Sequence, residues 1–404
     1  MQPILFLLLA GVLLAKVVVM VLLGPSLMDA DASQWWALGG RVARGDWMLR
    51  PVGDGAWEPL YPWLVGLLRR TSSRPRLVLT CLQAFFWTAT MIIASSLSGQ
   101  IARRAAAPFL AIGTGVFLIT SVLWTTTLSP LPLMSFLLVL HLWQVVMLVH
   151  RPGLGRALLA AMSIGLLALA VQDTLWLGAL DVVYVLASLL WPVPGDRARR
   201  LWGTTLIGLA LVLIPMLGLR FFSPSEDPTR DWPQTVYNKA RAQPKAYARQ
   251  WADQAQTYWT SVSEDVPLRV KGERVLPEID NGEGNENELD GDELSWSVSI
   301  PIAGEVSRYR LSQYSIANAI LAILTLVSVL WMVIRRNTRA AGLWLGLVLV
   351  YFQTAGGELG KLGYEDRLIT EPLILTIIVV AFSTLLFAPR KSTKPHPDSN
   401  RAPS

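Results

Sequence analysis

The stretch LPLMSFLLVLHLWQVVMLV, residues 131–149, decides the class of fold because it contains no Asp, Glu, Lys or Arg. A helix of about 20 apolar residues crosses the hydrocarbon core of a bilayer, and this run has that length and character. Comparable runs recur along the chain and predict roughly ten spans. They cover residues 4–24, 77–97, 105–124, 131–149, 156–172, 175–192, 202–220, 314–334, 340–355 and 369–387.

The composition of the whole chain agrees with this interpretation. Hydrophobic residues make up 52% of the 404 residues, charged residues only 16%, and the mean hydropathy is +0.43. These values are typical of an all-α polytopic membrane protein. The net charge of +6 comes from arginines clustered between the apolar runs, where they are topology signals and not a nucleic-acid surface. Cys81 is the single cysteine, so the chain has no intrachain disulfide.

Loops rich in Lys and Arg predict the orientation of the spans, because such loops stay in the cytoplasm. Most of them fall on one side if the N-terminus is cytoplasmic: residues 103–104, 150–156, 197–200, 335–339 and the tail from 388. The exception is LRRTSSRPR, residues 68–76, whose arginines fall on the outer side and are expected to reach the lipid headgroups. We therefore expect an integral membrane protein with both termini in the cytoplasm.

The same pattern divides the chain into segments. Residues 1–220 are predicted to form an N-terminal transmembrane module whose first outer loop spans 25–76. Residues 221–313 form a long outer loop between spans 7 and 8, residues 314–388 a C-terminal transmembrane module, and residues 389–404 a disordered cytoplasmic tail. The acidic run PEIDNGEGNENELDGDELSW, residues 277–296, is interpreted as a solvated flexible segment of the long loop.

Each of the two outer loops contains a predicted amphipathic helix. In the first loop Trp35, Leu38 and Val42 share one helical face, which indicates a helix lying on the membrane surface with Asp31 just before it as the N-cap. In the long loop the face is aromatic and is expected to pack on the membrane surface or on the first loop. Its members are Tyr247, Trp251, Gln254 and Tyr258.

The first outer loop resembles a known family. DADASQWWALGGRVARGDW, residues 29–47, is similar to the first outer loop of the polyprenyl-phosphate-sugar-dependent integral membrane glycosyltransferases. This GT-C class includes the protein O-mannosyltransferases and the aminoarabinose transferase of lipid A. The positions that match the family pattern are the acid, the aromatic residue, the leucine, the small residue and the later Gly-Asp pair, which are Asp31, Trp35, Leu38, Gly39 and Gly45-Asp46.

Two further segments carry the resemblance. EPLYPWLVGLL, residues 58–68, looks like the Pro-x-Tyr-Pro segment of the family, and YEDRLITEPLILTII, residues 364–378, resembles the segment that enters a late span, with Arg367 and Pro372 at matched positions. The chain also departs from the pattern. TLSPLPLM, residues 127–134, lacks the acid that relatives often have there, and Gln172-Asp173 stands where they often show Arg-Pro.

The resemblance implies transfer of a sugar from a polyprenyl-phosphate donor to a glycan, lipid or protein acceptor at the outer, periplasmic face, in contact with membrane lipids. Such a reaction needs a base for the acceptor hydroxyl and cations for the departing phosphate. Asp31 is the expected base, and Asp29 assists it or forms with it an Asp-x-Asp pair for a divalent cation, Mg²⁺ or Mn²⁺. The expected phosphate-binding residues are Arg367 and Lys361, and the expected acceptor or sugar contacts are Glu58, Tyr61 and Asp46.

Structural roles remain open for the same residues. Asp29 and Asp31 also suit a helix N-terminus, whose dipole favours negative charge. Arg367 has acids close by in sequence with which it can form a local salt bridge, and Tyr61 also suits an interfacial anchor. Asp181 lies inside a predicted span, where an acid needs a partner. Other functions also remain open: a non-catalytic family member or scaffold in envelope glycan assembly, and a transporter of a lipid-linked or small polar substrate.

Overall fold

The computed structural model describes residues 7, 10–15, 17–18, 30–47, 49, 59–103, 106–109, 111–112, 128–170, 177–189, 238, 241–260, 306–358 and 363–386. Throughout these ranges the backbone forms helices joined by turns, and no strand occurs in them. The predicted all-α class is therefore confirmed for this part of the chain.

Helices long and apolar enough to cross a membrane are present. They are α4 (Pro75–Ala102), α7 (Leu131–His150) and the Ile369–Leu386 part of α15 (Gly363–Leu386). Shorter apolar helices are α8 (Leu154–Ala170), α9 (Leu177–Leu189), the Ala319–Ile334 part of α13 (Val306–Ile334) and most of α14 (Arg339–Glu358).

Each of these helices coincides with a predicted apolar run. The runs are 77–97, 131–149, 156–172, 175–192, 314–334, 340–355 and 369–387. The predicted runs 4–24, 105–124 and 202–220 lie mostly or wholly outside the described residues. The structure therefore supports a helical membrane protein, and the total of about ten spans remains a prediction.

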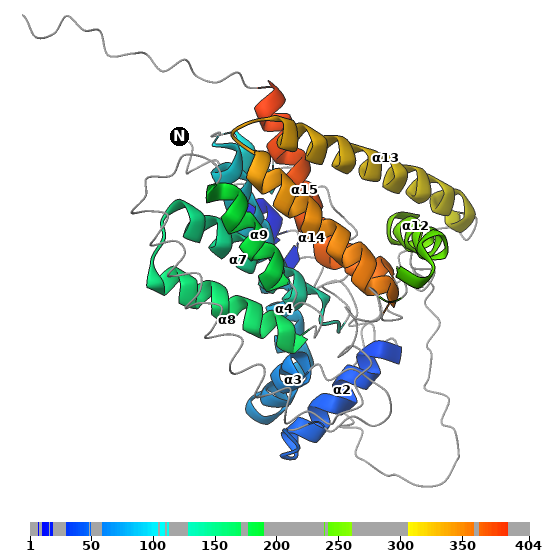
Figure 1. Cartoon of the computed structure of the whole chain (residues 1–404). Helices are drawn as coiled ribbons and strands as arrows, with labels where there is room; N and C mark the ends of the chain where they lie inside the picture. Colours follow the sequence, from blue (N-terminus) through cyan, green and yellow to red (C-terminus); the bar gives the residue numbers. More distant parts are fainter. Residues whose placement is uncertain are drawn as a thin grey trace, which may run out of the picture.

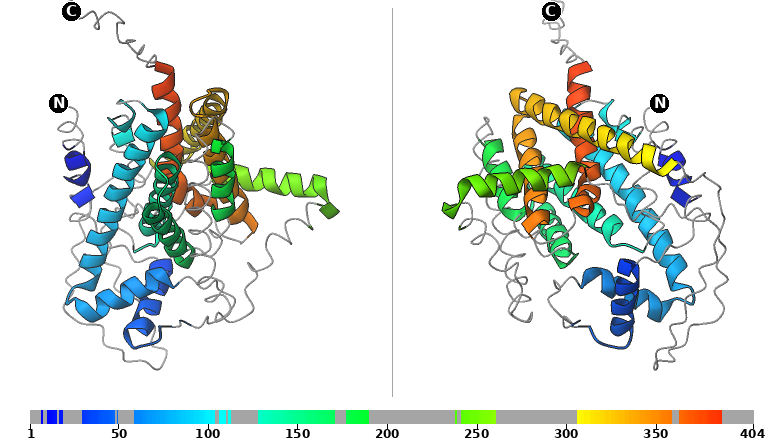
Figure 2. Two further views of the ribbon diagram at one scale, coloured as in Figure 1. Left: turned by 60° about the vertical axis from the view of Figure 1, so that its left-hand side comes forward. Right: turned by 90° about the vertical axis from the view of Figure 1, so that its right-hand side faces the viewer.

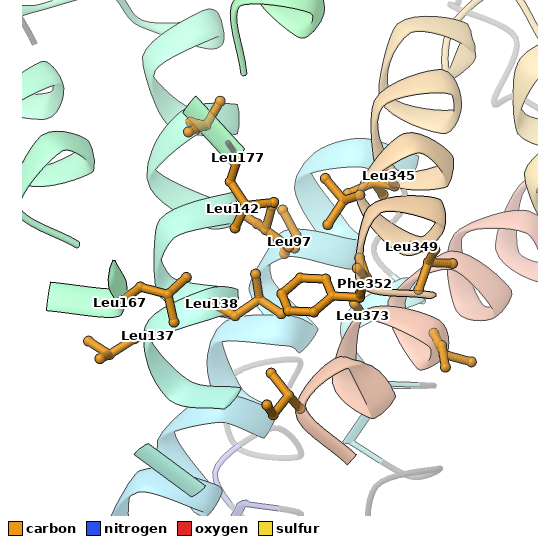
Figure 3. Packing of buried hydrophobic residues seen from close by; sticks show 14 of the residues in the cluster. Leu97, Leu137, Leu138, Leu142, Leu167, Leu177, Leu345, Leu349, Phe352 and Leu373 are labelled. Carbon is orange, nitrogen blue, oxygen red and sulfur yellow. The ribbon is translucent and has the colours of Figure 1, made fainter. Parts of the chain in front are cut away.

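The core lies where α4, α7, α14 and α15 meet. Leu138 and Leu142 of α7, Leu97 of α4 and Leu373 of α15 are fully buried within one apolar cluster, together with Phe352 of α14 (Figure 3). Helix α15 packs against α4 and α7 as well as against α13 and α14. The helices of the two predicted transmembrane segments therefore share one core.

The outer faces of several helices expose large apolar side chains. On α13, Ile323, Leu326 and Ile334 are 61% to 70% exposed, and Phe85 on α4 and Met162 on α8 are similarly exposed. Contiguous apolar surface of this kind is rare on soluble monomers. These faces are suited to contact with lipid chains.

Hydroxyl groups inside the apolar helices bond to their own backbone. Thr88 and Ser98 of α4 each donate to the carbonyl oxygen four residues earlier at 2.8 Å, and Thr376 of α15 does the same to Pro372. Without water in the hydrocarbon region, a polar group has to find its partner within the protein. These residues therefore fit buried helices without needing an external partner.

Two helices of the predicted first outer loop lie at one end of the bundle. These are α2 (Ala30–Ala43) and α3 (Leu60–Thr71), and Figures 1 and 2 show them at the end where α4 begins and toward which the start of α15 points. The sequence predicted the first of these helices and missed the second. Pro59 is the N-cap residue of α3 and Pro62 lies in its first turn, where a missing backbone N–H leaves no helical bond unmade.

The predicted aromatic helix of the long outer loop is α12 (Pro244–Thr260), which projects from the bundle (Figure 2). Its C-terminal part packs against α13, α14 and α15. The Tyr258 side chain is 1% exposed, and its hydroxyl is hydrogen-bonded to that of Thr370 on α15. The expectation that this aromatic face would lie on the membrane surface or on the first loop is therefore wrong for Tyr258, because the transmembrane bundle offers it a partner for the hydroxyl.

Candidate functional site

The predicted first outer loop contains a close crossing of α2 and α3. A Cβ atom added to Gly66 would lie 2.5 Å from the Cβ of Val42 and 2.9 Å from the carbonyl oxygen of Gly39. Only glycine lets the two backbones approach this closely. Val42 and Val65 are fully buried at the crossing, and the Trp35 ring meets the Tyr61 ring edge-on with centroids 5.9 Å apart.

The end of α2 is closed by a Schellman motif. The amide of Gly45 donates to the carbonyl of Val42 at 2.9 Å, and the amide of Asp46 donates to the carbonyl of Arg41 at 3.1 Å. Gly45 has φ +104°, a backbone conformation that residues with a Cβ rarely adopt. The Gly-Asp pair of the sequence motif thus terminates the helix.

The Asp46 carboxylate is held by Arg41. The Nε and Nη2 atoms of Arg41 both donate to Oδ2 of Asp46, at 2.9 and 2.6 Å. Both side chains are partly exposed, so the pair contributes only modestly to stability. Contact of Asp46 with an acceptor or sugar stays a prediction, and it would have to compete with this ion pair.

The predicted base, Asp31, is the second residue of α2. The expectation that it is the N-cap residue is wrong, because the helix begins one residue earlier, at Ala30. A carboxylate in the first turn still lies at the positive end of the helix dipole. The structure describes the backbone of Asp31 but not its side chain, and Asp29 lies outside the described residues.

Tyr61 ties α3 to α4 and to the start of α7. Its side chain is 2% exposed, and its hydroxyl accepts a hydrogen bond of 3.1 Å from Nε2 of Gln83 on α4. The same Nε2 donates to the carbonyl of Ser129 at 2.6 Å. Burial raises the pKa of the Tyr61 hydroxyl well above its usual range, so it stays protonated. Tyr61 is a packing residue in this structure, and its contact with a sugar stays a prediction.

Of the predicted phosphate ligands, Arg367 lies in a described helix, near the start of α15. Arg367 is the fifth residue of that helix, but its side chain is outside what the structure describes, and Lys361 and Glu58 lie outside the described residues. In Figures 1 and 2 the start of α15 points toward the end of the bundle where α2 and α3 lie. The structure does not describe how the side chains of Asp31 and Arg367 lie.

No metal site is formed by the described side chains, among which no three His, Cys, Asp or Glu residues lie together. Neither predicted ligand, Asp29 nor Asp31, has a described side chain. The Mg²⁺ or Mn²⁺ site therefore stays a prediction.

A second polar site lies inside the bundle. Nε2 of His141 on α7 is 2.7 Å from Oδ2 of Asp181 on α9, and Nδ1 of His141 is 3.2 Å from both the hydroxyl of Ser163 and the carbonyl of Ala160 on α8. All three side chains are almost completely buried. The expectation that Asp181 needs a partner is met by His141, which the sequence analysis did not single out. No periodicity signals this pairing, because the two residues are 40 positions apart.

The hydrogen-bond roles of His141 depend on its tautomer. With the hydrogen on Nδ1, the ring donates to the carbonyl of Ala160, which can only accept, and to the hydroxyl oxygen of Ser163. With the hydrogen on Nε2, the ring donates to Asp181 and accepts at Nδ1 from the Ser163 hydroxyl. Both arrangements place a polar partner beside Asp181 within the bundle, as an acid in an apolar interior requires.

In comparisons with known proteins, no family model matches this chain, and no curated protein matches it significantly.

Proposed function

We propose that this protein is an integral membrane glycosyltransferase that moves a sugar from a polyprenyl-phosphate donor to an acceptor on the outer, periplasmic face of a bacterial inner membrane. The observation that carries the proposal is the position of α2. Its first turn contains Asp31, and its close crossing with α3 holds it at the end of the bundle toward which the start of α15, with Arg367, points. The motif resemblance of residues 29–47 adds the chemical class.

In the proposed reaction the acceptor hydroxyl loses its proton to Asp31 while its oxygen forms a bond to C1 of the sugar. The bond between C1 and the phosphate oxygen breaks, and its electron pair leaves with the polyprenyl phosphate. Arg367 and Lys361 bind that phosphate, since guanidinium and ammonium groups stabilise the charge that develops there. Asp29 assists Asp31 at the acceptor, and no step requires a metal ion.

The test uses the purified full chain with polyprenyl-phosphate sugars of several kinds and measures release of polyprenyl phosphate. We expect Asp31→Asn to lower kcat by a factor of about 10² to 10⁴, as loss of a general base does, with little change in KM for the donor. Asp253→Asn, which changes an exposed acid on α12, is the matched control and should keep full activity. A wild-type protein that consumes no such donor, or an Asp31→Asn variant as active as wild type, contradicts the proposal.

The buried pair of His141 and Asp181 supports a second candidate, a transporter of a lipid-linked or small polar substrate. Ionisable residues within spans often mark proton or substrate pathways, and Oδ1 of Asp181 is buried with no hydrogen-bond partner among the described residues. Proton uptake by proteoliposomes that is lost in Asp181→Asn and kept in Asp31→Asn would favour this candidate. Sugar transfer that is lost in Asp31→Asn and kept in Asp181→Asn would favour the glycosyltransferase.

A further inference from the structure

Arginines gather where α3 ends and α4 begins. Arg69 and Arg70 lie in the last turn of α3, Arg74 is the residue before α4, and Arg76 lies in its first turn. Arg44, just after α2, is close enough that its charge and that of Arg76 add to partial burial in lowering the pKa of Arg69. We call the four exposed residues of this group, Arg44, Arg69, Arg70 and Arg74, the arginine patch.

Aromatic rings position Arg69 and Arg70 without neutralising them. The Cζ atom of Arg69 lies 4.8 Å from the ring centroid of Trp36, which Arg76 approaches to 5.2 Å, and the Cζ atom of Arg70 lies 5.9 Å from the ring centroid of Trp47. Nη1 of Arg69 also donates to the carbonyl of Trp36 at 3.1 Å. Cation–π contacts hold a guanidinium in place but leave its charge.

The described side chains of this loop bring no counter-charge to the patch. Asp46 is the one carboxylate among them, and it binds Arg41, which is not part of the patch. Guanidinium groups that crowd together repel one another, which destabilises the loop unless an anion lies between them. The patch therefore has the charge and the hydrogen-bond donors of an anion site.

The patch also lies at a membrane boundary. Directly after it, Leu77, Val78 and Phe85 of α4 expose 46%, 39% and 58% of their surface, on a helix long and apolar enough to span a bilayer. Cys81 is exposed on the same stretch. Tryptophans beside arginines at the end of a span are typical of the headgroup layer. The arginines thus border on the face of α4 that is suited to lipid.

We propose that the arginine patch binds the phosphate groups of anionic phospholipids in the leaflet where α4 begins. A guanidinium group binds phosphate through two parallel hydrogen bonds, and four of them next to lipid-facing apolar residues suit an anionic headgroup whose chains lie along α4. This explains why LRRTSSRPR stands against the positive-inside pattern. The site is independent of the proposed glycosyl transfer.

Cys81 provides a local test, because it is the single cysteine and lies about 7.5 Å along the helix from Arg76. A benzophenone maleimide attached to Cys81 of the full chain, in phosphatidylcholine vesicles with a minor share of phosphatidylglycerol, captures neighbouring lipids on illumination. Mass spectrometry then counts the adducts. We expect phosphatidylglycerol to exceed its share of the bilayer by about fivefold or more, since each arginine near the headgroups contributes roughly that preference.

The decisive variant combines Arg44→Gln, Arg69→Gln, Arg70→Gln and Arg74→Gln and should capture phosphatidylglycerol only in proportion to its share. The matched control removes the same charge elsewhere, with Arg103→Gln, Arg151→Gln, Arg335→Gln and Arg336→Gln, all exposed residues at ends of α4, α7 and α13 that lie away from the patch. The control should keep the enrichment. Equal loss in both variants would mean a net-charge effect and would overturn the proposal.

Two competitors and a salt series complete the test with the wild-type protein. Sodium chloride should reduce the enrichment progressively, because screening weakens exposed charge pairs. Inorganic phosphate at matched ionic strength should do no more than chloride, and a stronger effect would assign the site to free phosphate instead. Displacement of phosphatidylglycerol by trace polyprenyl phosphate would assign the patch to the sugar donor. Enrichment that ignores salt, or no enrichment at all, would also overturn the proposal, even if the four-arginine variant fails to fold.

Discussion

Gly45 and Asp46 show how one residue pair serves two interpretations. Their match to a glycosyltransferase motif suggests chemistry, but the backbone of Gly45, with φ +104°, ends α2 and Asp46 binds Arg41. A helix that ends in this conformation needs a residue without a Cβ. The motif therefore has a structural cause that holds whether or not a sugar binds there.

Gly45→Ala isolates that structural cause. No atom lies within 4 Å of a Cβ added at this position, so the effect comes from the backbone conformation alone. We expect a loss of about 1 to 2 kcal/mol in the free energy of unfolding, measured by thermal unfolding in detergent. Gly155→Ala, equally open in space but in the first turn of α8, is the control and should leave stability unchanged or slightly raised. Equal effects of the two substitutions would contradict the conclusion that the backbone conformation of Gly45 requires a residue without a Cβ.

Substitutions of the two residues in the buried pair of His141 and Asp181 are expected to reduce stability by different amounts. His141→Leu leaves the Asp181 carboxyl without its described partner in an apolar interior, and we expect a loss of about 3 to 5 kcal/mol. Asp181→Asn keeps the size and a polar atom facing Nε2 of His141, so the loss should be less than half as large. Thermal unfolding of the two variants in one detergent checks the order. A loss for Asp181→Asn as large as that for His141→Leu would contradict this asymmetry.

Among the elements, the crossing of α2 and α3 depends on Gly66. A methyl group there meets Val42 and the backbone of Gly39, so Gly66→Ala should push α2 away from α3. We expect the amides of residues 30–43 to exchange with deuterium about tenfold faster or more, which corresponds to roughly 1.4 kcal/mol of local stability, while α7 stays unchanged.

Gly165→Ala is the control for this crossing, because the same change inside α8 meets no atom within 4 Å. It should leave exchange in α2 as it is. If Gly66→Ala also leaves the exchange of residues 30–43 unchanged, the close approach of the two helices is not what holds α2 in place.

The apolar runs predicted the long helices because length and hydropathy alone decide whether a segment can span a bilayer. Helices α4, α7 and α15 begin or end within a few residues of the predicted runs, although α4 extends further and α15 begins earlier. Helix α3 was not predicted. Its sequence, LYPWLVGLLRRT, is short and contains Pro62, and both features are also typical of loops. Its formation depends on packing against α2, which the pattern does not contain.

The candidate site was less accessible to prediction from the sequence. Trp35 and Val42 were placed on one helical face, and the structure has them packed against α3, beside Tyr61 and Val65. The partners of Tyr61 and Asp181 come from residues 22 and 40 positions away. Such contacts are set by how helices pack, which hydropathy does not encode.

For the whole molecule, the arrangement of α4 and α7 predicts that residues 72 and 153 lie on opposite sides of the membrane. Gln83 near the start of α4 bonds to Ser129 at the start of α7, so the two helices begin at one end and finish at the other. In a Cys81→Ser background, the thiol introduced by Ser72→Cys should react with a membrane-impermeant maleimide applied to intact cells. Gly153→Cys should react only after the membrane is opened, because the basic loop around it is predicted to lie in the cytoplasm.

The two outcomes that differ from this expectation have separate meanings. The reverse labelling pattern would invert the predicted orientation while keeping the fold. Labelling of both positions from outside would contradict the arrangement of α4 and α7 itself.

The central position of α15 has a consequence for biosynthesis. This helix packs against α4, α7, α12, α13 and α14, yet it follows all of them in the order of translation. Until it emerges from the ribosome, the faces of α4 and α7 that contain Leu97 and Leu138 have to be covered by lipid or by the insertion machinery. Assembly of the bundle is therefore completed late, and a ribosome stalled before residue 363 would leave an intermediate whose inner surface is open to the bilayer.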